Sequence, residues 1–238
     1  MGLRSLFDLP IDMGWRHVLF ANWPVDPEVV AAHLPEPLTV DTYEGQAWLS
    51  VVPFTNIAVR PAGLPAWAGF DLPELNLRTY VTHGDTEAIY FFSLDADGIL
   101  GVTGARLFHH LPYYYADIDI ESDGGLVSYT SRRRHPGARP ANFDATYRPT
   151  GDGYRSEPGS LDAFLTERYR FYTETPDGEL RYSNVQHDRW PLFEAEADLR
   201  TNQVFETNGF AHPGGDPCLL YSPALTVSAS ESKRPDDT

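Results

Sequence analysis

Cysteine and lysine are nearly missing from this chain of 238 residues. Cys218 is the only cysteine, so the chain can form no internal disulfide and no zinc site built from cysteines. Lys233 is the only lysine, and the other 17 of the 18 basic residues are arginine. Chemistry that needs a lysine amine is therefore confined to one position near the C-terminus.

Positive charge is scarce as a whole. Asp and Glu total 34, and the formal net charge is −16. Nucleic acids and anionic membranes present phosphates that require a basic surface, so we expect neither as a partner. A negative, lysine-poor composition favours adaptation to high salt, where charge keeps a protein soluble. The alternative is an ordinary acidic protein from a GC-rich genome, in which arginine replaces lysine.

Long apolar runs are also missing. No segment approaches the roughly 18 apolar residues of a membrane span, and the opening MGLRSLFDLP contains no run typical of a signal peptide. We therefore expect a cytoplasmic protein without a membrane partner. A homo-oligomer is compatible with this composition.

Residues that favour strands and turns are abundant. Tyr and Phe contribute 13 each, and the 20 Pro and 19 Gly predict many turns. Pro53 predicts an edge or a bulge within its strand. The patterns that predict strands are WRHVLFANWPV, QAWLSVVPFTNIAV, ELNLRTYVTH, EAIYFFSLDAD, YYADIDIES, GLVSYTSRR, ELRYSNVQH, CLLYS and ALTVS.

Two helix signals interrupt the strands. Asp26 is a good N-cap with Pro27 at the first helical position, and Ser160 caps the segment LDAFLTERY. A strand-rich chain with two or three short helices predicts a mainly β (α+β) fold, built as a single closed β-barrel. We expect an N-terminal arm over residues 1–11, one domain over 12–228 and a disordered tail over 229–238.

One strand carries an unusual polar face. Because side chains alternate along a strand, Glu74, Asn76, Arg78 and Tyr80 share one side of ELNLRTYV. Such a face is commonly solvated. In a closed barrel it can instead line a ligand cavity.

The eight histidines form no recognisable metal motif. His109 and His110 are adjacent, so on a strand they point to opposite faces. No Gly-x-Ser-x-Gly elbow or phosphate-binding loop occurs, and we expect no metal and no cofactor.

The segment SRRRHPGAR is the only basic cluster, with Arg132, Arg133, Arg134, His135 and Arg139. It is interpreted as a strand end that neutralises nearby acids, or alternatively as a gate that attracts an anionic ligand.

Several segments together resemble a known family. ELNLRTYV, YFFSLDAD, ARLFHHLPYYYADI, FLTERYRFY and VQHDRWPL are similar to the uncharacterised DUF2071 (YqjF-like) family over roughly residues 12–225. That family in turn resembles acetoacetate decarboxylase, a cone-shaped β-barrel with a buried cavity. The resemblance implies the same closed barrel here.

The decarboxylase resemblance also implies positions for site residues. HLPEPLTVD is similar to a decarboxylase segment, and the strand upstream then places Arg16 on that family's active-site arginine. ARLFHHLPYY keeps the spacing of the motif Gly-Arg-Glu-x-x-x-x-Pro-Lys-Lys from Arg106 onward. Tyr113 and Tyr114 stand where its two lysines would be, and Glu74 falls near the catalytic glutamate.

A tyrosine cannot replace the catalytic lysine. A Schiff base needs a primary amine, so decarboxylation through an imine is excluded. The resemblance leaves Arg16 to bind a carboxylate, Glu74 to act as acid or base, and Tyr113 to donate to a carbonyl or enolate oxygen. The candidate catalytic residues are Glu74 and Tyr113, and the candidate ligand-binding residues are Trp15, Arg16, Asn76, Arg78, Tyr80, Arg106 and Trp190.

We therefore expect a barrel that binds a small carboxylate or keto-acid-like ligand. If it is an enzyme, its chemistry is non-covalent acid–base catalysis of lyase or hydratase type. The alternatives are a non-enzymatic binding or sensor module with the same pocket, and a structural interaction module whose barrel is filled by its own side chains. In the last case Arg16 and Glu74 form a buried pair.

Overall fold

The computed structural model describes residues 10–98, 112–175 and 177–235. Its strands are β1 (Ile11–Val25), β2 (Thr39–Val40), β3 (Ala47–Pro61), β4 (Phe70–His83), β5 (Thr86–Asp97), β6 (Tyr113–Asp123), β7 (Leu126–Arg133), β8 (Asn142–Tyr154), β9 (Arg170–Glu174), β10 (Leu180–His187), β11 (Leu192–Asn202) and β12 (Cys218–Ala229). The helical segments of this part of the chain are α1 (Pro27–Ala31), η2 (Ala66–Ala68), α3 (Leu161–Thr166) and α4 (Val204–Thr207). The mainly β fold with a few short helices is confirmed.

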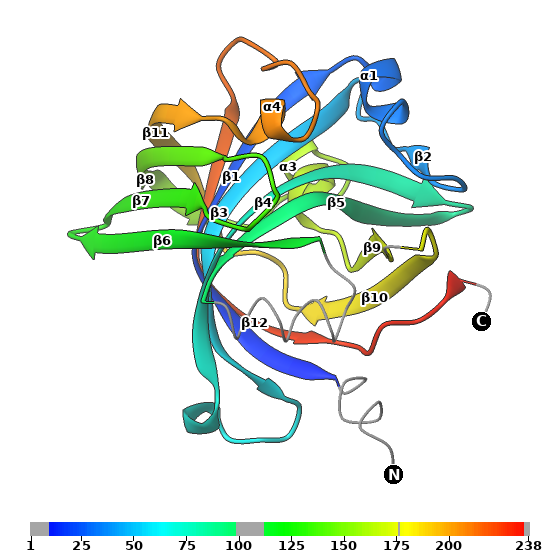
Figure 1. Ribbon diagram of the computed structural model, residues 1–238. Helices are drawn as coiled ribbons and strands as arrows, with labels where there is room; N and C mark the ends of the chain where they lie inside the picture. Colours follow the sequence, from blue (N-terminus) through cyan, green and yellow to red (C-terminus); the bar gives the residue numbers. More distant parts are fainter. Residues whose placement is uncertain (1–9, 99–111, 176, 236–238) are drawn as a thin grey trace.

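All twelve strands belong to one sheet that curves back on itself (Figure 1). The order β5-β6-β7-β8-β11-β12-β1-β3-β4 closes into a ring through the β4–β5 pairing. A second path joins β5 to β12 through β9 and β10. The sheet is therefore broadly closed, and the second path meets the ring at β5 and at β12.

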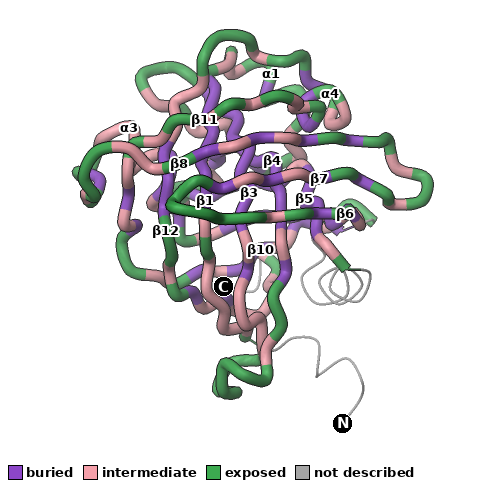
Figure 2. Tube along the Cα trace, turned by 90° about the vertical axis from the view of Figure 1, so that its left-hand side faces the viewer, coloured by how far each residue is buried: buried purple, intermediate pink, exposed green. Residues whose placement is uncertain are grey.

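Both faces of the central strands are buried, as the purple stretches along β1, β3 and β4 show in Figure 2. In β4, Leu75 and Leu77 pack into the larger core with Tyr129, Phe143 and others. The opposite face of β4 meets β9 and β10 and a separate cluster of apolar residues. On the Leu75 and Leu77 side of β4, side chains fill the space inside the ring. On the opposite side of β4, a cavity remains between the side chains.

The two predicted helix starts are confirmed. The Asp26 Oδ1 accepts a 2.9 Å hydrogen bond from the Glu28 backbone N–H, and Pro27 opens α1. The Ser160 Oγ accepts a 3.2 Å hydrogen bond from the Ala163 backbone N–H at the start of α3. Each cap satisfies a backbone donor that the first helical turn leaves free.

A bulge in β1 decides which of its side chains face the cavity. Five steps along β1, from Arg16 to Ala21, oppose four along β3, from Thr55 to Val51. His17 absorbs the extra residue with a φ of 54°. Pro53 lies in β3 opposite this point, but the extra residue is on β1, and the pairing of β3 with β4 is regular at Pro53. The expected edge or bulge in the strand of Pro53 is therefore a bulge in its neighbour.

The ends of the chain differ from the expected arm and tail. Ile11 already opens β1, and residues 1–9 lie outside the described residues. At the other end, the backbones of Tyr182 and Lys233 exchange hydrogen bonds of 2.9 and 2.8 Å. The prediction of a disordered tail is therefore wrong for residues 229–235, because a neighbouring strand satisfies this backbone.

Candidate functional site: a cavity with a glutamate and an arginine

A cavity of about 320 Å³ lies between the inner faces of β1, β3, β4 and β5 and the strands β9 and β10. Most of its wall is apolar, as is usual for small-molecule sites. Its outer end reaches the surface at Pro61 and Phe70, which are exposed. The aromatic side chains along it include Trp15, Phe20, Phe54, Phe91, Phe171 and Trp190.

Glu74 is the acidic centre of the cavity, with only 3% of its surface exposed. Its Oε2 accepts hydrogen bonds from the Tyr113 hydroxyl at 2.7 Å and from the Asn56 Nδ2 at 3.1 Å. Its Oε1 accepts a longer one from the Asn76 Nδ2 at 3.4 Å. Burial raises the pKa of Glu74, and the donated hydrogen bonds only partly oppose this rise.

Tyr113 begins β6 and reaches Glu74 across β5. Burial, and next the nearby Glu74 carboxyl, raise the pKa of the Tyr113 hydroxyl well above its ordinary value. The phenol therefore stays neutral and acts as a donor. The cavity consequently contains a proton-carrying pair, in which Glu74 can exchange a proton while Tyr113 orients it.

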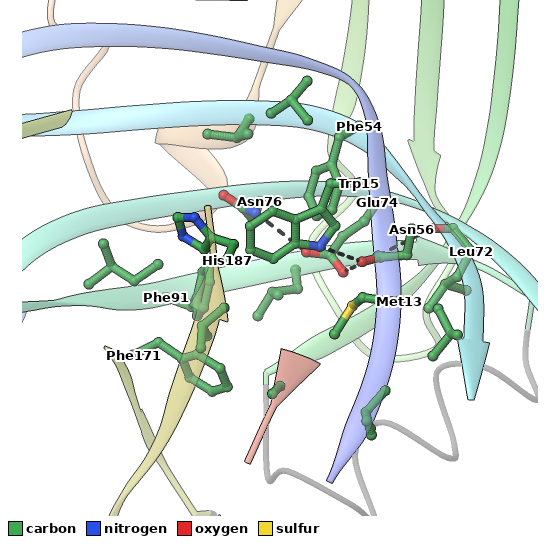
Figure 3. Close-up of a pocket in the computed structure, with 18 of the residues that line it drawn as sticks. Met13, Trp15, Phe54, Asn56, Leu72, Glu74, Asn76, Phe91, Phe171 and His187 are labelled. Atoms are coloured by element: carbon green, nitrogen blue, oxygen red, sulfur yellow. Dashed lines mark hydrogen bonds between the residues drawn. The ribbon is translucent and has the colours of Figure 1, made fainter. Parts of the chain in front are cut away.

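Asn56 orients this pair from the neighbouring strand. Its Nδ2 also donates to the Leu72 carbonyl at 3.2 Å, and its Oδ1 accepts from the Trp15 Nε1 at 2.9 Å. In Figure 3, hydrogen bonds join Trp15 to Asn56 and Asn56 to Glu74. Sequence reasoning missed Asn56, although an asparagine in the middle of a strand is itself unusual.

Arg78 is the cationic counterpart on the same strand. It is 8% exposed, its Nη2 donates to the Leu165 carbonyl at 3.1 Å, and its Cζ lies 5.2 Å from the centre of the Phe20 ring. Within the described part of the chain, no carboxylate lies within 4.0 Å of it, and its Nε has no hydrogen-bond partner. A buried charge without a counter-charge is costly, so this position favours an anion.

Arg168 lines the same cavity but is already neutralised. Its Nη1 lies 2.8 Å from an Asp41 oxygen and 3.1 Å from a Glu87 oxygen. Its Nε donates to the Phe164 carbonyl at 2.9 Å. Arg60 and Arg170 also line the cavity and are only partly buried. Among the described lining arginines, Arg78 is therefore the buried one that has no carboxylate partner.

The structure brings six of the nine sequence-predicted residues together. The lining residues among them are Trp15, Glu74, Asn76, Arg78, Tyr113 and Trp190. Tyr80 is fully buried beside the cavity, where its hydroxyl donates to the Leu165 carbonyl at 2.8 Å and lies 2.8 Å from the Ser50 Oγ. Arg106 lies outside the described residues. Arg16 is exposed, and the cavity is not lined by it.

The bulge explains why the prediction of Arg16 in the cavity is wrong. In an unbroken strand, Arg16 would share a face with Val18 and Phe20, which do line the cavity. The extra residue at His17 moves the next inward position to Trp15 and turns Arg16 outward. The alternative of a buried pair between Arg16 and Glu74 is wrong for the same reason.

The basic segment neutralises acids, and the cavity is not lined by it. The Arg133 Nε lies 2.7 Å from the Asp95 Oδ1, and the Arg134 Nε lies 2.8 Å from the Asp117 Oδ2. Burial outweighs the nearby arginine and raises the pKa of Asp95 to about 6. Of the two interpretations, the strand end that neutralises acids agrees with these pairs.

The described residues contain neither a metal cluster nor a membrane-spanning helix. No group of three or more His, Cys, Asp or Glu side chains there is placed to hold a metal ion. No helix in this part of the chain is long and apolar enough to cross a membrane.

Comparison with known proteins identifies the family of this chain. Residues 12–226 match DUF2071, a family described as uncharacterized conserved proteins. The chain belongs to the DUF2071 family. A relative, the uncharacterized protein YqjF of Bacillus subtilis (strain 168), is 47% identical over 209 residues, which are 87% of this chain and 85% of YqjF.

Solved structures show that this DUF2071 protein has an acetoacetate-decarboxylase-like fold. The enduracididine biosynthesis enzyme MppR complexed with pyruvate superposes with a TM-score of 0.65 at 10% identity, over 94% of this chain and 89% of MppR. An acetoacetate decarboxylase-like enzyme from Sphingomonas wittichii RW1 gives 0.58 at 17% identity, over 94% and 91%. The decarboxylase of Legionella pneumophila gives 0.59 at 12% identity, over 94% and 86%. At these identities the likeness establishes the fold alone.

Proposed function

We propose that the cavity binds a small organic carboxylate of the keto-acid type and holds it without a covalent bond. Arg78 carries this proposal, because it is a buried guanidinium in the cavity wall with no carboxylate partner among the described residues. A ligand carboxylate supplies the missing charge and can accept parallel hydrogen bonds from the guanidinium. The structure of the fold neighbour MppR complexed with pyruvate supports the same class of ligand.

Acid–base chemistry on the bound ligand is the second part of the proposal. Glu74, as a carboxylate, removes a proton from the carbon beside the ligand's carbonyl, and the electron pair moves onto the carbonyl oxygen. The protonated Glu74 returns the proton in the reverse step. An imine route is closed, because the only lysine of the chain, Lys233, lies beside Glu231 and does not line the cavity.

Calorimetric titration tests the carboxylate recognition. Pyruvate and 2-oxobutanoate are each compared with their primary amides, which have nearly the same shape and no charge. We expect the acids to bind at least tenfold more tightly than the amides, since a charge-assisted hydrogen bond contributes about 1.5–3 kcal/mol. Arg78→Met should remove that difference, and Arg16→Met, at an exposed arginine outside the cavity, should leave it intact.

Two outcomes would contradict the proposal. Equal affinity of the wild type for acid and amide would show that the cavity does not bind a carboxylate selectively. An acid preference that persists in Arg78→Met but disappears in Arg16→Met would place the anion site on the outer surface. Exchange of the ligand's α-protons with D₂O, lost in Glu74→Gln, separates an enzyme from a binding module.

A further inference from the structure

The two functional ends of the cavity lie far apart on one strand. Glu74 and Arg78 are four residues apart on β4 and both line the cavity. At about 3.3 Å per residue, their Cα atoms are separated by about 13 Å. The site is therefore long as well as narrow.

The side chains do not converge to shorten this distance. The Arg78 Nη2 donates to the Leu165 carbonyl, which also accepts the Tyr80 hydroxyl from one pleat further along β4. The guanidinium thus leans away from Glu74. At the other end, Asn56 bonds both Glu74 and the Leu72 carbonyl, which holds the carboxyl toward the start of β4.

Apolar walls and one amide lie between these ends. The Trp15 and Trp190 rings are stacked with centroids 5.3 Å apart, and the Phe91 and Phe171 rings lie 5.6 Å apart. In Figure 3, Phe91 and Phe171 lie to the lower left of Glu74, Met13 lies below it, and Leu72 lies to the right beside Asn56. A cavity of this volume has room for about ten waters at roughly 30 Å³ each, so a three-carbon acid would leave most of the wall bare.

We propose that the ligand is an elongated monocarboxylate with an apolar middle and a ketone toward its far end. Its carboxylate binds Arg78, its chain lies along the aromatic walls, and its ketone oxygen accepts a hydrogen bond at the Glu74–Tyr113 pair. This inference rests on the proposed carboxylate recognition and adds the length and the second polar group.

The distance between the ends sets the position of the ketone. Subtracting about 3 Å for a hydrogen bond at each end from the 13 Å leaves roughly 7 Å for the ligand. An extended chain advances about 1.3 Å per carbon, so the ketone falls near the sixth or seventh carbon. Asn76 lies between the ends, with an Oδ1 that is buried and lacks a partner in the described residues.

Isomeric keto acids test the proposal in the wild-type protein. Nonanoate with the ketone at carbon 2, 4 or 7 is titrated beside plain nonanoate and nonanamide. The three keto acids share charge, length and composition, so only the ketone position differs. We expect the 7-oxo acid to bind about tenfold more tightly than the 2-oxo acid and than nonanoate, the gain of one hydrogen bond.

Each outcome separates this inference from the proposed function. Nonanoate that binds better than nonanamide, with equal affinity for the three isomers, would overturn the elongated ligand and leave carboxylate recognition standing. Tightest binding by the 2-oxo acid, or binding of pyruvate alone, would overturn the elongated ligand in the same way. Equal binding of nonanoate and nonanamide would overturn the proposed function itself. In Arg78→Met, all acids should weaken, and the preference for the 7-oxo isomer should shrink, because the carboxylate no longer has a fixed position from which the ketone is reached.

Discussion

Two buried arginines allow the same substitution to be compared with and without a carboxylate partner. Arg133 is 7% exposed and lies 2.7 Å from Asp95, which is 1% exposed. Arg78 is 8% exposed and has no acidic partner in the described residues. We predict that Arg133→Met lowers the free energy of unfolding by about 3–5 kcal/mol, because it strands a buried carboxylate. Arg78→Met should change it by less than about 1 kcal/mol, since gains and losses nearly cancel.

The structure shows why the cost at Arg78 is small. The Leu165 carbonyl that loses the Arg78 hydrogen bond still accepts one from the Tyr80 hydroxyl at 2.8 Å, so no buried acceptor is left unsatisfied. Loss of the charged hydrogen bond and of the contact with the Phe20 ring costs about 2–5 kcal/mol. Relief from burying an unpaired charge returns several kcal/mol. Methionine keeps the apolar contacts of the arginine stem.

Urea unfolding with linear extrapolation measures both changes, with Arg16→Met as the exposed control. The measurement is made at pH 6 and pH 8. Without Arg133, the pKa of Asp95 rises beyond about 6, so the folded state binds a proton more tightly than the unfolded state. The loss in Arg133→Met should therefore be larger at pH 8 than at pH 6. A loss at Arg78 as large as that at Arg133 would refute the reasoning, because it would show that Arg78 has a structural counter-charge.

Two further substitutions test the Glu74 site and the loop that contains Gly69. Burial raises the pKa of Glu74 above its ordinary value of 4.5, so its contribution to stability is lost as the pH rises from 4.5 through the folded-state pKa. Asp95 titrates in the same way in both proteins, so Glu74→Gln should lose less stability over this range than the wild type. Thermal melts of both from pH 4 to 8 check this, and parallel curves would contradict it. Gly69→Ala would place a Cβ 2.7 Å from the Ala58 Cα. Because backbone atoms cannot easily move aside, the free energy of unfolding should fall by about 1–3 kcal/mol. Trp67→Ser, at an 86% exposed side chain of the same loop, should stay within about 0.5 kcal/mol, and equal effects of the two would disprove the steric argument.

Local rules of the chain predicted most of the fold. Asp26 and Ser160 cap their helices as expected, because capping depends on a few neighbouring atoms. The alternation along ELNLRTYV correctly separated Leu75 and Leu77 from the polar face. Alternation alone could not say whether that polar face was solvated. The outcome depends on residues of β9 and β10, such as Phe171 and Val185, which lie opposite this face although they are distant in the sequence.

The candidate site was predictable where pleat geometry is regular and failed where it is not. Glu74, Asn76 and Arg78 were placed on one face and lie there. Arg16 was misplaced because a single residue with positive φ, His17, reverses the side-chain alternation of β1. Nothing in the local pattern WRHVLF marks that residue as a bulge. The buried cavity arginine without a carboxylate partner among the described residues is consequently Arg78 on β4.

The tyrosine at position 113 changes what its glutamate can do. A lysine there, as the decarboxylase resemblance implies for that family, would place an ammonium next to Glu74 and hold the glutamate ionised. The neutral Tyr113 phenol donates one hydrogen bond at 2.7 Å and adds no charge, so burial can raise the pKa of Glu74. With a tyrosine in place of the lysine, the site has no nucleophilic amine. The Glu74 carboxyl beside it holds its proton more tightly than an ordinary glutamate. Among the described arginines that line the cavity, Arg78 alone is both buried and without a carboxylate within 4.0 Å. The charge that balances it must come from Glu74 or from a ligand, and the distance along β4 favours the ligand.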